Sequence, residues 1–118
     1  MEEKLEEFQN LIGKIKDSGI LVVVEGKKDK AALQKLGIKN IKELSKKPIF
    51  QIVEEIAHSN IDCVILTDLE SEGFVLYSKL NSNLQKYGVK VDNRLREFLF
   101  RNTKLKQIEG IDSYLIEY

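Results

Sequence analysis

Two uninterrupted aliphatic runs constrain the fold of this chain more than any other feature. They are ILVVV at residues 20–24 and CVIL at residues 63–66. A strand with one exposed face alternates apolar and polar residues, whereas a strand of a parallel sheet is covered on both faces and is apolar throughout. The two runs therefore predict central strands of a parallel sheet with helices on both sides.

Segments with helical periodicity alternate with the strands. Apolar residues recur at helical spacing in residues 1–19, 29–37, 48–57, 71–87 and 91–102. Weaker strands are predicted at residues 38–44 and 89–91, and a last strand with a short closing turn or helix at residues 106–118. Strands that alternate with helices predict right-handed crossovers. We expect one α/β domain over residues 1–118 with a mostly parallel, Rossmann-like sheet, in which residues 1–19 form an N-terminal helix and residues 20–118 carry the motifs.

The balance of charges limits the class of partner. Lys and Arg together number 19, as do Asp and Glu, so the net charge is zero. Any contact with nucleic acid must therefore come from a local patch and not from an overall field. One cysteine, Cys63, excludes an intramolecular disulfide and fits a reducing compartment. No apolar stretch approaches the ~20 residues of a membrane span. The N-terminus lacks a signal-peptide pattern, so we expect a cytoplasmic protein without membrane contact.

Carboxylates follow both central strands. Glu25 comes directly after the first strand, and Asp68, with Glu70 two residues on, follows the second. If the strands are neighbours, about 4.8 Å apart, these acids converge at the carboxyl edge of the sheet, where functional groups of parallel sheets gather. Three carboxylates without Cys or His suit a hard cation, and Mg²⁺ is the natural choice.

A purely structural interpretation competes with the metal site. Asp68 could cap the following helix, and Glu70 and Glu72 could complement the positive end of its dipole. Asp29 is predicted to cap the helix of residues 29–37 in the same way. Glu25 has no such explanation, because Asp29 already fills the capping role. The two segments together favour a metal site.

The residues around these acids resemble the two motifs of the Toprim fold. VVVEGKKDKAAL is similar to the first motif, in which Glu-Gly follows hydrophobic residues and an Asp comes three residues later. VILTDLESEG is similar to the second, in which Asp-x-Asp follows a strand and a Gly comes three residues on. Toprim domains occur in bacterial-type primases, topoisomerases, old-family nucleases, recombination proteins and the ribonuclease that matures 5S ribosomal RNA. The resemblance covers the chain from about Ile20 onward and is greatest to the small stand-alone Toprim proteins of archaea and thermophilic bacteria, which also carry a segment like VDNRLREFL.

The resemblance assigns roles to individual positions. The invariant Glu of the family falls on Glu25 and its first Asp on Asp68, while Glu70 holds the second Asp position. The longer side chain of Glu70 moves its carboxylate by about 1.5 Å, which implies a shifted or water-mediated metal contact or a preference for Mn²⁺. Gly26 and Gly73 match the family's glycines and imply tight strand-to-helix turns with close backbone approach.

The chemistry implied by the resemblance is phosphoryl transfer or phosphodiester cleavage of the nuclease or primase type. Mg²⁺ held by Asp68 and Glu70 would neutralise charge on the scissile phosphate. Glu25 would be a further ligand or the general acid/base. No nucleophilic tyrosine is assigned, because Tyr77 and Tyr87 lie on an apolar helix face and are predicted to be core.

Basic residues near the acids must supply any phosphate contacts. Lys27 and Lys28 follow Glu25 directly and are candidates. Arg94 is the stronger candidate for a phosphate contact on the helix of residues 91–102. Arg101, seven residues further along the same side of that helix, is the weaker candidate.

Two functions remain open from the sequence. One is a Mg²⁺-dependent nuclease or nucleotidyl- or phosphotransferase that acts on DNA or RNA. The other is a non-catalytic nucleic-acid or ribonucleoprotein binding module with a metal-bridged phosphate, which engages its target through a protein partner. A receiver-like signalling domain is disfavoured, because only one acid follows the first strand. The choice of DNA or RNA, the substrate and the oligomeric state are not determined by these patterns.

Overall fold

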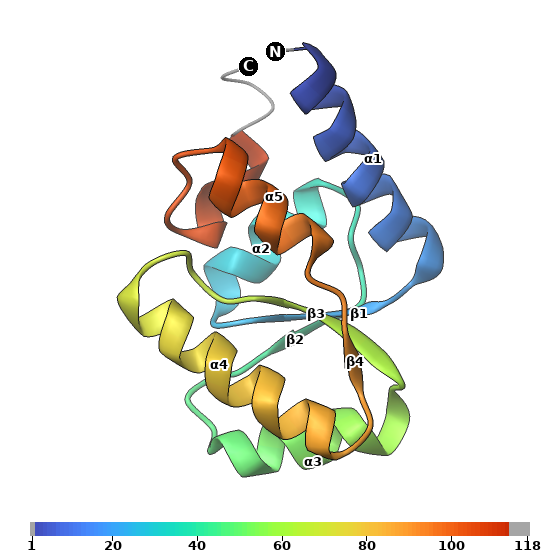
Figure 1. The fold of residues 1–118 in the computed structure, drawn as a ribbon, viewed down its shortest axis with the longest axis vertical. Coiled ribbons are helices and arrows are strands. Elements are labelled where there is room, and N and C mark those ends of the chain that lie inside the picture. Colours follow the sequence, from blue (N-terminus) through green and yellow to red (C-terminus); the bar gives the residue numbers. More distant parts are fainter. Residues whose placement is uncertain (1, 114–118) are drawn as a thin grey trace.

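Four parallel strands form the central sheet of the protein (Figure 1). In the computed structural model, which describes residues 2–113, the strands are β1 (Leu21–Val24), β2 (Ile41–Glu43), β3 (Asp62–Leu66) and β4 (Lys90–Val91). They lie side by side in the order β2-β1-β3-β4, and each pairing is parallel. The predicted parallel α/β architecture is confirmed.

The two aliphatic runs occupy the centre of the sheet, as predicted. Val24 of β1 pairs with Leu66 of β3, so the two strands end side by side. Side chains of a strand point alternately to opposite faces. Val22 and Val64 accordingly lie in one hydrophobic core, and Val23 with Ile65 in a second core on the other face.

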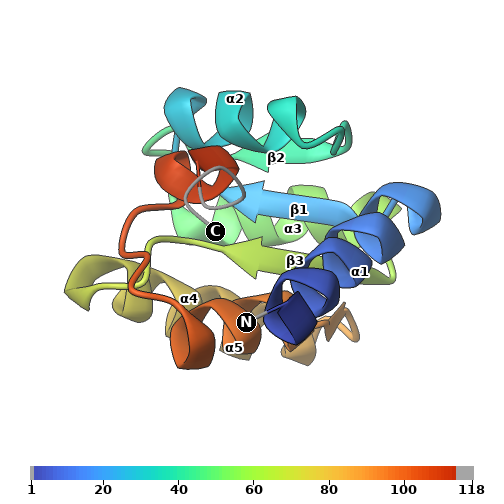
Figure 2. The same cartoon turned by 90° about the horizontal axis from the view of Figure 1, so that it is seen from above.

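Helices cover both faces of the sheet (Figure 2). The helical elements are α1 (Glu2–Ser18), α2 (Lys27–Lys35), α3 (Ile49–Ser59), α4 (Ser71–Lys86), α5 (Arg94–Asn102) and the 3₁₀ helix η1 (Ile108–Gly110). Apolar side chains of α1, α2, α5 and η1 share the first core, and those of α3 and α4 share the second. The unbroken apolar character of β1 and β3 follows from this cover on both sides.

The stop signals that the sequence predicts for two helices are confirmed. Gly19 follows α1 with φ 67° and Gly88 follows α4 with φ 81°. A residue without a Cβ adopts this left-handed conformation at little cost and so ends a helix readily.

The predicted last strand is wrong for residues 106–113. Ile108–Gly110 form η1, and residues 111–113 are helical. Ile108 and Ile111 are both fully buried in the first core. A spacing of three residues places both on one side of a helical turn, whereas on a strand they would point to opposite faces. Residues 114–118 of the predicted strand lie outside the described residues.

Two predicted side-chain roles also change. Asp29 is not the N-cap of α2: Gly26 holds that position, and Asp29 is the third residue of the helix. Tyr87 is 59% exposed, so it is not a core residue. Tyr77 is half-buried, and its hydroxyl donates a hydrogen bond to Asn93 Oδ1 at 2.6 Å.

None of the helices within residues 2–113 combines the length and the apolar character needed to cross a membrane.

Candidate functional site

The strand order places a topological switch point between β1 and β3. From β1 the chain crosses to β2 on one side of it, whereas β3 lies on the other side. The connections that leave the carboxyl ends of β1 and β3 therefore diverge, and α2 and α4 begin on opposite faces of the sheet. Ligands of open α/β sheets bind in the crevice outside such a point.

Glu25 and Asp68 meet at this switch point. Glu25 Oε2 accepts a hydrogen bond of 2.7 Å from the backbone N–H of Asp68. Asp68 Oδ1 in turn accepts one of 2.9 Å from the N–H of Ile108. Both acids are half-buried, and neither Glu25 Oε1 nor Asp68 Oδ2 has a hydrogen-bond partner among residues 2–113. The predicted proximity of these two acids is confirmed, and each has one carboxylate oxygen available.

Asp29 is a third acid at this edge of the sheet. It is only 8% exposed, and its Oδ2 accepts a 3.0 Å hydrogen bond from the N–H of Gly26. Burial raises the pKa of Asp29 from its ordinary 3.8 to about 6; the bond from Gly26 opposes this, and the charges of Asp68, Glu25 and Glu109 add to it. The sequence-based prediction that Asp29 only caps a helix did not anticipate its place beside the other two acids. The signal was the Glu-Gly-x-x-Asp spacing, which returns a second acid to the same strand end one helical turn later.

Glu70 does not complete a cluster of three ligands with Glu25 and Asp68. Among residues 2–113, no three or more Asp, Glu, His or Cys side chains are grouped so that they could hold a metal ion together. Glu70 is the N-cap residue of α4, its backbone is extended (φ −148°, ψ 179°), and its side chain is exposed and forms no capping bond. The predicted convergence of three carboxylates is therefore not found. The chain turns outward at Glu70 to begin α4.

The acid pair nevertheless fits a hydrated Mg²⁺. This ion is usually held by one or two carboxylates and keeps several waters or binds phosphate oxygens. Glu25 and Asp68 each offer one oxygen with no hydrogen bond within residues 2–113. Those two residues could hold the ion, whereas a fully protein-built cage is not present in the described part of the chain.

Arg96 holds the end of β3 and the loop that follows it, residues 65–68, through buried hydrogen bonds to backbone carbonyls. It is 6% exposed, and its Nη1 donates hydrogen bonds to the carbonyls of Thr67 at 2.7 Å and Ile65 at 3.4 Å. Its Nη2 reaches the carbonyl of Asp68 at 3.3 Å. The guanidinium carbon lies 4.5 Å from the centroid of the Tyr77 ring, a cation–π contact. Burial lowers the pKa of Arg96, an effect opposed by Tyr77, Glu25 and Asp68.

The sequence contained a signal for the burial of Arg96. Arg96 precedes Leu99 by three residues, so the two share a face of α5. Leu99 is fully buried, and an arginine on that face must find partners inside the protein.

Gly73 makes the close backbone approach that the sequence predicts. A Cβ on Gly73 would lie 2.5 Å from the carbonyl carbon and 2.8 Å from the nitrogen of Asp68. The buried hydroxyl of Thr67 donates a 2.7 Å hydrogen bond to the Gly73 carbonyl. Gly26 lies in the tight turn between β1 and α2, as predicted, but the close backbone approach is not found within residues 2–113, because a Cβ there would have nothing within 4 Å.

A groove of about 1350 Å³ has walls that include Lys28, next to Asp29, and Gln107 and Glu109 on either side of Ile108. Figure 2 shows how the segment after α5 crosses the carboxyl ends of the strands to reach α2. This groove is lined by five cationic side chains, those of Lys28, Lys35, Arg101, Lys104 and Lys106. Two acids, Glu70 and Glu109, lie at its wall. Lys28, predicted as a phosphate contact, lies here, and Lys27 is exposed in the first turn of α2 without lining the groove.

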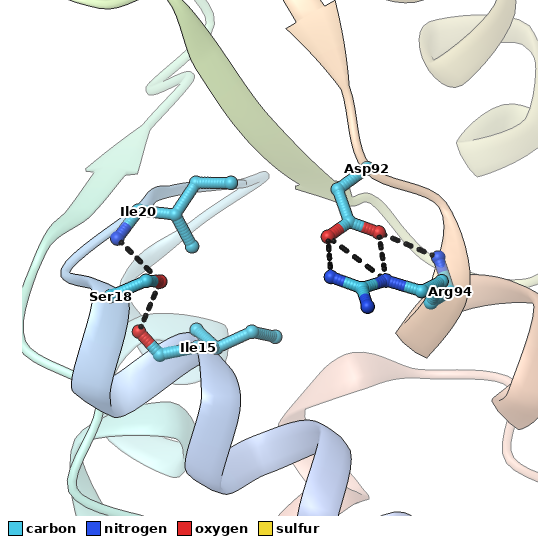
Figure 3. A network of polar contacts seen from close by, with 5 residues as sticks. All are labelled: Ile15, Ser18, Ile20, Asp92 and Arg94. Carbon is cyan, nitrogen blue, oxygen red and sulfur yellow. Dashed lines mark hydrogen bonds and ion pairs between the residues drawn. The ribbon is translucent and has the colours of Figure 1, made fainter.

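Arg94 lies away from the acids. Its Nη2 forms an ion pair of 2.7 Å with Asp92, and Figure 3 shows this pair beside the end of α1 that carries Ser18. It lines a hollow with Asp62, which begins β3, so it lies at the amino end of the sheet. α5 runs in the same direction as β3, and seven residues of helix advance about 10 Å. Arg101, predicted to be the lesser candidate, is therefore the one at the groove.

Comparison with known proteins places the chain in a family. No family model matches it. A UPF0292 protein of Methanosarcina barkeri is 32% identical over 118 residues, covering 96% of this chain and 81% of the relative. The chain belongs to the UPF0292 family. A UPF0292 protein of Pyrococcus horikoshii is 37% identical over 111 residues, which cover 93% of this chain and 83% of that protein.

A solved structure has the same fold as this UPF0292 protein. The structure is that of an Aquifex aeolicus protein, with a TM-score of 0.74 and 29% sequence identity, and the match covers 93% of this chain and 96% of the other. The names of these UPF0292 relatives state no activity.

Proposed function

We propose that this UPF0292 protein is a Toprim-type protein that binds Mg²⁺ and acts on nucleic-acid phosphodiesters. The observation that carries the proposal is the 2.7 Å hydrogen bond between Glu25 and the backbone of Asp68. It joins the acids of the two motifs at the carboxyl ends of adjacent parallel strands. The order and spacing of the motif residues around this pair support the same assignment.

Each residue of the site has a part in this chemistry. Glu25 and Asp68 would hold the ion through the oxygens that have no hydrogen bond among residues 2–113. Positive charge bound there would stabilise the charge that develops on a phosphoryl group during transfer. Asp29 adds negative charge to the site above pH 6, and Arg96 holds the Asp68 loop in place.

Metal binding by isosteric variants tests the proposal. Glu25→Gln and Asp68→Asn retain an oxygen that can accept the N–H of Asp68 and of Ile108 respectively, so they remove charge and keep both hydrogen bonds. We expect each to weaken Mn²⁺ binding, followed by electron paramagnetic resonance, by at least about tenfold. Asp62→Asn, at the exposed amino end of β3, is the matched control and should bind Mn²⁺ like the unaltered protein.

Turnover is measured on the same proteins with labelled RNA and DNA in Mg²⁺. Cleavage or transfer that disappears in Glu25→Gln and Asp68→Asn supports the enzyme. Undiminished Mn²⁺ binding in both variants would overturn the proposed metal site.

A second candidate is a binding module without catalysis. Two observations favour it: the acid pair lacks a third protein ligand within residues 2–113, and five cations line the nearby groove. Salt-sensitive nucleic-acid binding with no turnover distinguishes this function from the first.

A further inference from the structure

Two exposed phenylalanines, one on α4 and one on α5, lie in contact with each other. Phe74 is 39% exposed and Phe100 is 62% exposed. Their ring centroids are 5.8 Å apart at 80°, an edge-to-face pair. Burying one such side chain would stabilise the protein by about 1.5–3 kcal/mol, so leaving two together on the surface indicates a binding site.

Both phenylalanines lie close in sequence to residues that line the groove. Phe74 lies one helical turn after Glu70, and its N–H donates a 2.9 Å hydrogen bond to the Glu70 carbonyl. Phe100 directly precedes Arg101 at the end of α5. Glu70 and Arg101 both line the groove. The elements that carry the aromatic pair, α4 and α5, therefore each reach the wall of the groove, which places the two rings close to the cations.

The groove carries an excess of positive charge, because five cationic side chains line it and only two acids do. Among its five cations, Lys35 forms an ion pair with Asp112 at 3.4 Å. Lys28, Arg101, Lys104 and Lys106 form no ion pair with residues 2–113. A polyanion whose charges are spaced along a chain matches this lining, whereas an apolar partner would leave the cations unpaired.

We infer that the groove and the Phe74–Phe100 pair together bind single-stranded nucleic acid, with phosphates along the cations and bases stacked on the rings. This inference rests on the proposed function and specifies the form of its substrate. Exposed aromatic rings next to a cationic groove are the means by which proteins hold single strands, because an unpaired base offers a flat face to a ring. A duplex keeps its bases stacked inside and offers only its backbone.

Fluorescence anisotropy tests the inference. The probes are fluorescein-labelled oligouridylate and oligothymidylate, and a labelled duplex of the same length, measured in EDTA. We expect the Phe74→Ala, Phe100→Ala double variant to lose about tenfold or more in affinity for the single strands and to bind the duplex as the unaltered protein does. Phe50→Ala is the matched control, since Phe50 is 69% exposed on α3 and does not line the groove.

Charge variants test the other half of the surface. Arg101→Gln and Lys104→Gln should each weaken single-strand binding and reduce its salt dependence by about one counterion. Lys39→Gln, an exposed lysine that does not line the groove, should do neither.

Three results overturn the inference. The first is single-strand affinity unchanged in the double phenylalanine variant. The second is equal affinity of the unaltered protein for duplex and single strand. The third is a concentration-dependent dimer in sedimentation, abolished by the double variant, in a protein that binds no single strand; the rings would then be a self-association surface. Because single-strand binding is measured in EDTA, it does not depend on whether Glu25→Gln and Asp68→Asn lose or retain Mn²⁺ binding, so the two proposals fail separately.

Discussion

Gly73 has the least room for a side chain of any glycine in residues 2–113. Replacement by Ala would place its Cβ 2.5 Å from the carbonyl carbon of Asp68, and backbone cannot move aside as a flexible side chain can. We expect Gly73→Ala to lower the free energy of unfolding by about 1–3 kcal/mol or more, measured by urea denaturation.

Gly13→Ala is the control for this substitution. Gly13 lies inside α1, where a Cβ would have nothing within 4 Å. Ala favours a helix over Gly by roughly 0.5–1 kcal/mol, so this variant should be more stable than the unaltered protein. Equal effects of the two substitutions would contradict the close approach at Gly73.

Asp29 should make stability depend on pH. Its folded pKa of about 6 lies above the ordinary 3.8, so the folded state binds the proton more tightly than the unfolded chain. The stabilisation is therefore complete below pH 4 and is lost as pH rises through 6, by an amount on the order of 3 kcal/mol.

Asp29→Asn removes this titration and keeps an oxygen for the N–H of Gly26. In EDTA, its free energy of unfolding relative to the unaltered protein should rise between pH 4.5 and pH 7.5, as measured by urea denaturation at each pH. A difference that stays constant across this range would mean that Asp29 has an ordinary pKa.

The sequence predicts the places of Glu25 and Asp68 but not the roles of Asp29 and Arg96. The first two are found because neighbouring parallel strands end at one edge, which strand patterning reveals. Asp29 and Arg96 depend on burial. The same residue types in a solvated turn or helix would have no such role.

Arg96 ties α5 to the carboxyl end of β3. Its guanidinium donates to the carbonyls of Ile65, Thr67 and Asp68. Arg96→Met would leave buried carbonyls unpaired, and each such group costs about 1–3 kcal/mol. We expect a lower free energy of unfolding in urea and weaker Mn²⁺ binding at the loop that Arg96 supports.

Two further variants separate shape from charge in this contact. Arg96→Lys keeps the charge but cannot present a planar fork to several acceptors, so it should recover only part of the loss. Arg94→Met, on the same helix, breaks an exposed pair with Asp92 and should change little. A loss in Arg94→Met as large as that in Arg96→Met would indicate a general effect on α5.

Helices and strands were predicted correctly where the segment is long enough for its apolar residues to show a helical or strand period. The helices at the start of the chain and over residues 71–87 begin and end within a few residues of α1 and α4. The segment at residues 106–113 was misassigned because it is too short to show a period. Its conformation is decided by the burial of Ile108 and by its N–H bond to Asp68.

The two cores share the same strands, so the molecule should unfold as one unit. Cys63 is a probe of this, since it is fully buried in central strand β3. Burial, with a contribution from Asp62, raises the pKa of its thiol to about 11. Reaction with a disulfide reagent at pH 8 should therefore require unfolding of the sheet.

We expect the opening free energy from the labelling rate of Cys63 to equal the free energy of unfolding from urea denaturation. Leu99→Ala, in the core on the opposite face from Cys63, should destabilise by about 2–5 kcal/mol and accelerate labelling by the corresponding factor. A Cys63 labelling rate that is unchanged in Leu99→Ala would show that β3 opens locally.

The sequence by itself determined the class of fold and one pair of acids. Continuous apolar runs require cover on both faces, and helices between strands require parallel crossovers, so the layers follow from local patterns. Glu25 and Asp68 follow in turn, because they come directly after the two runs.

Only the tertiary structure decided which other side chains reach that edge. The direction of α5 along β3 brings Arg101 to the groove and takes Arg94 to the opposite end of the sheet. The packing of η1 brings an N–H to Asp68 from forty residues away. Such placements depend on contacts between distant segments, and local periodicity contains no information about the distance between them.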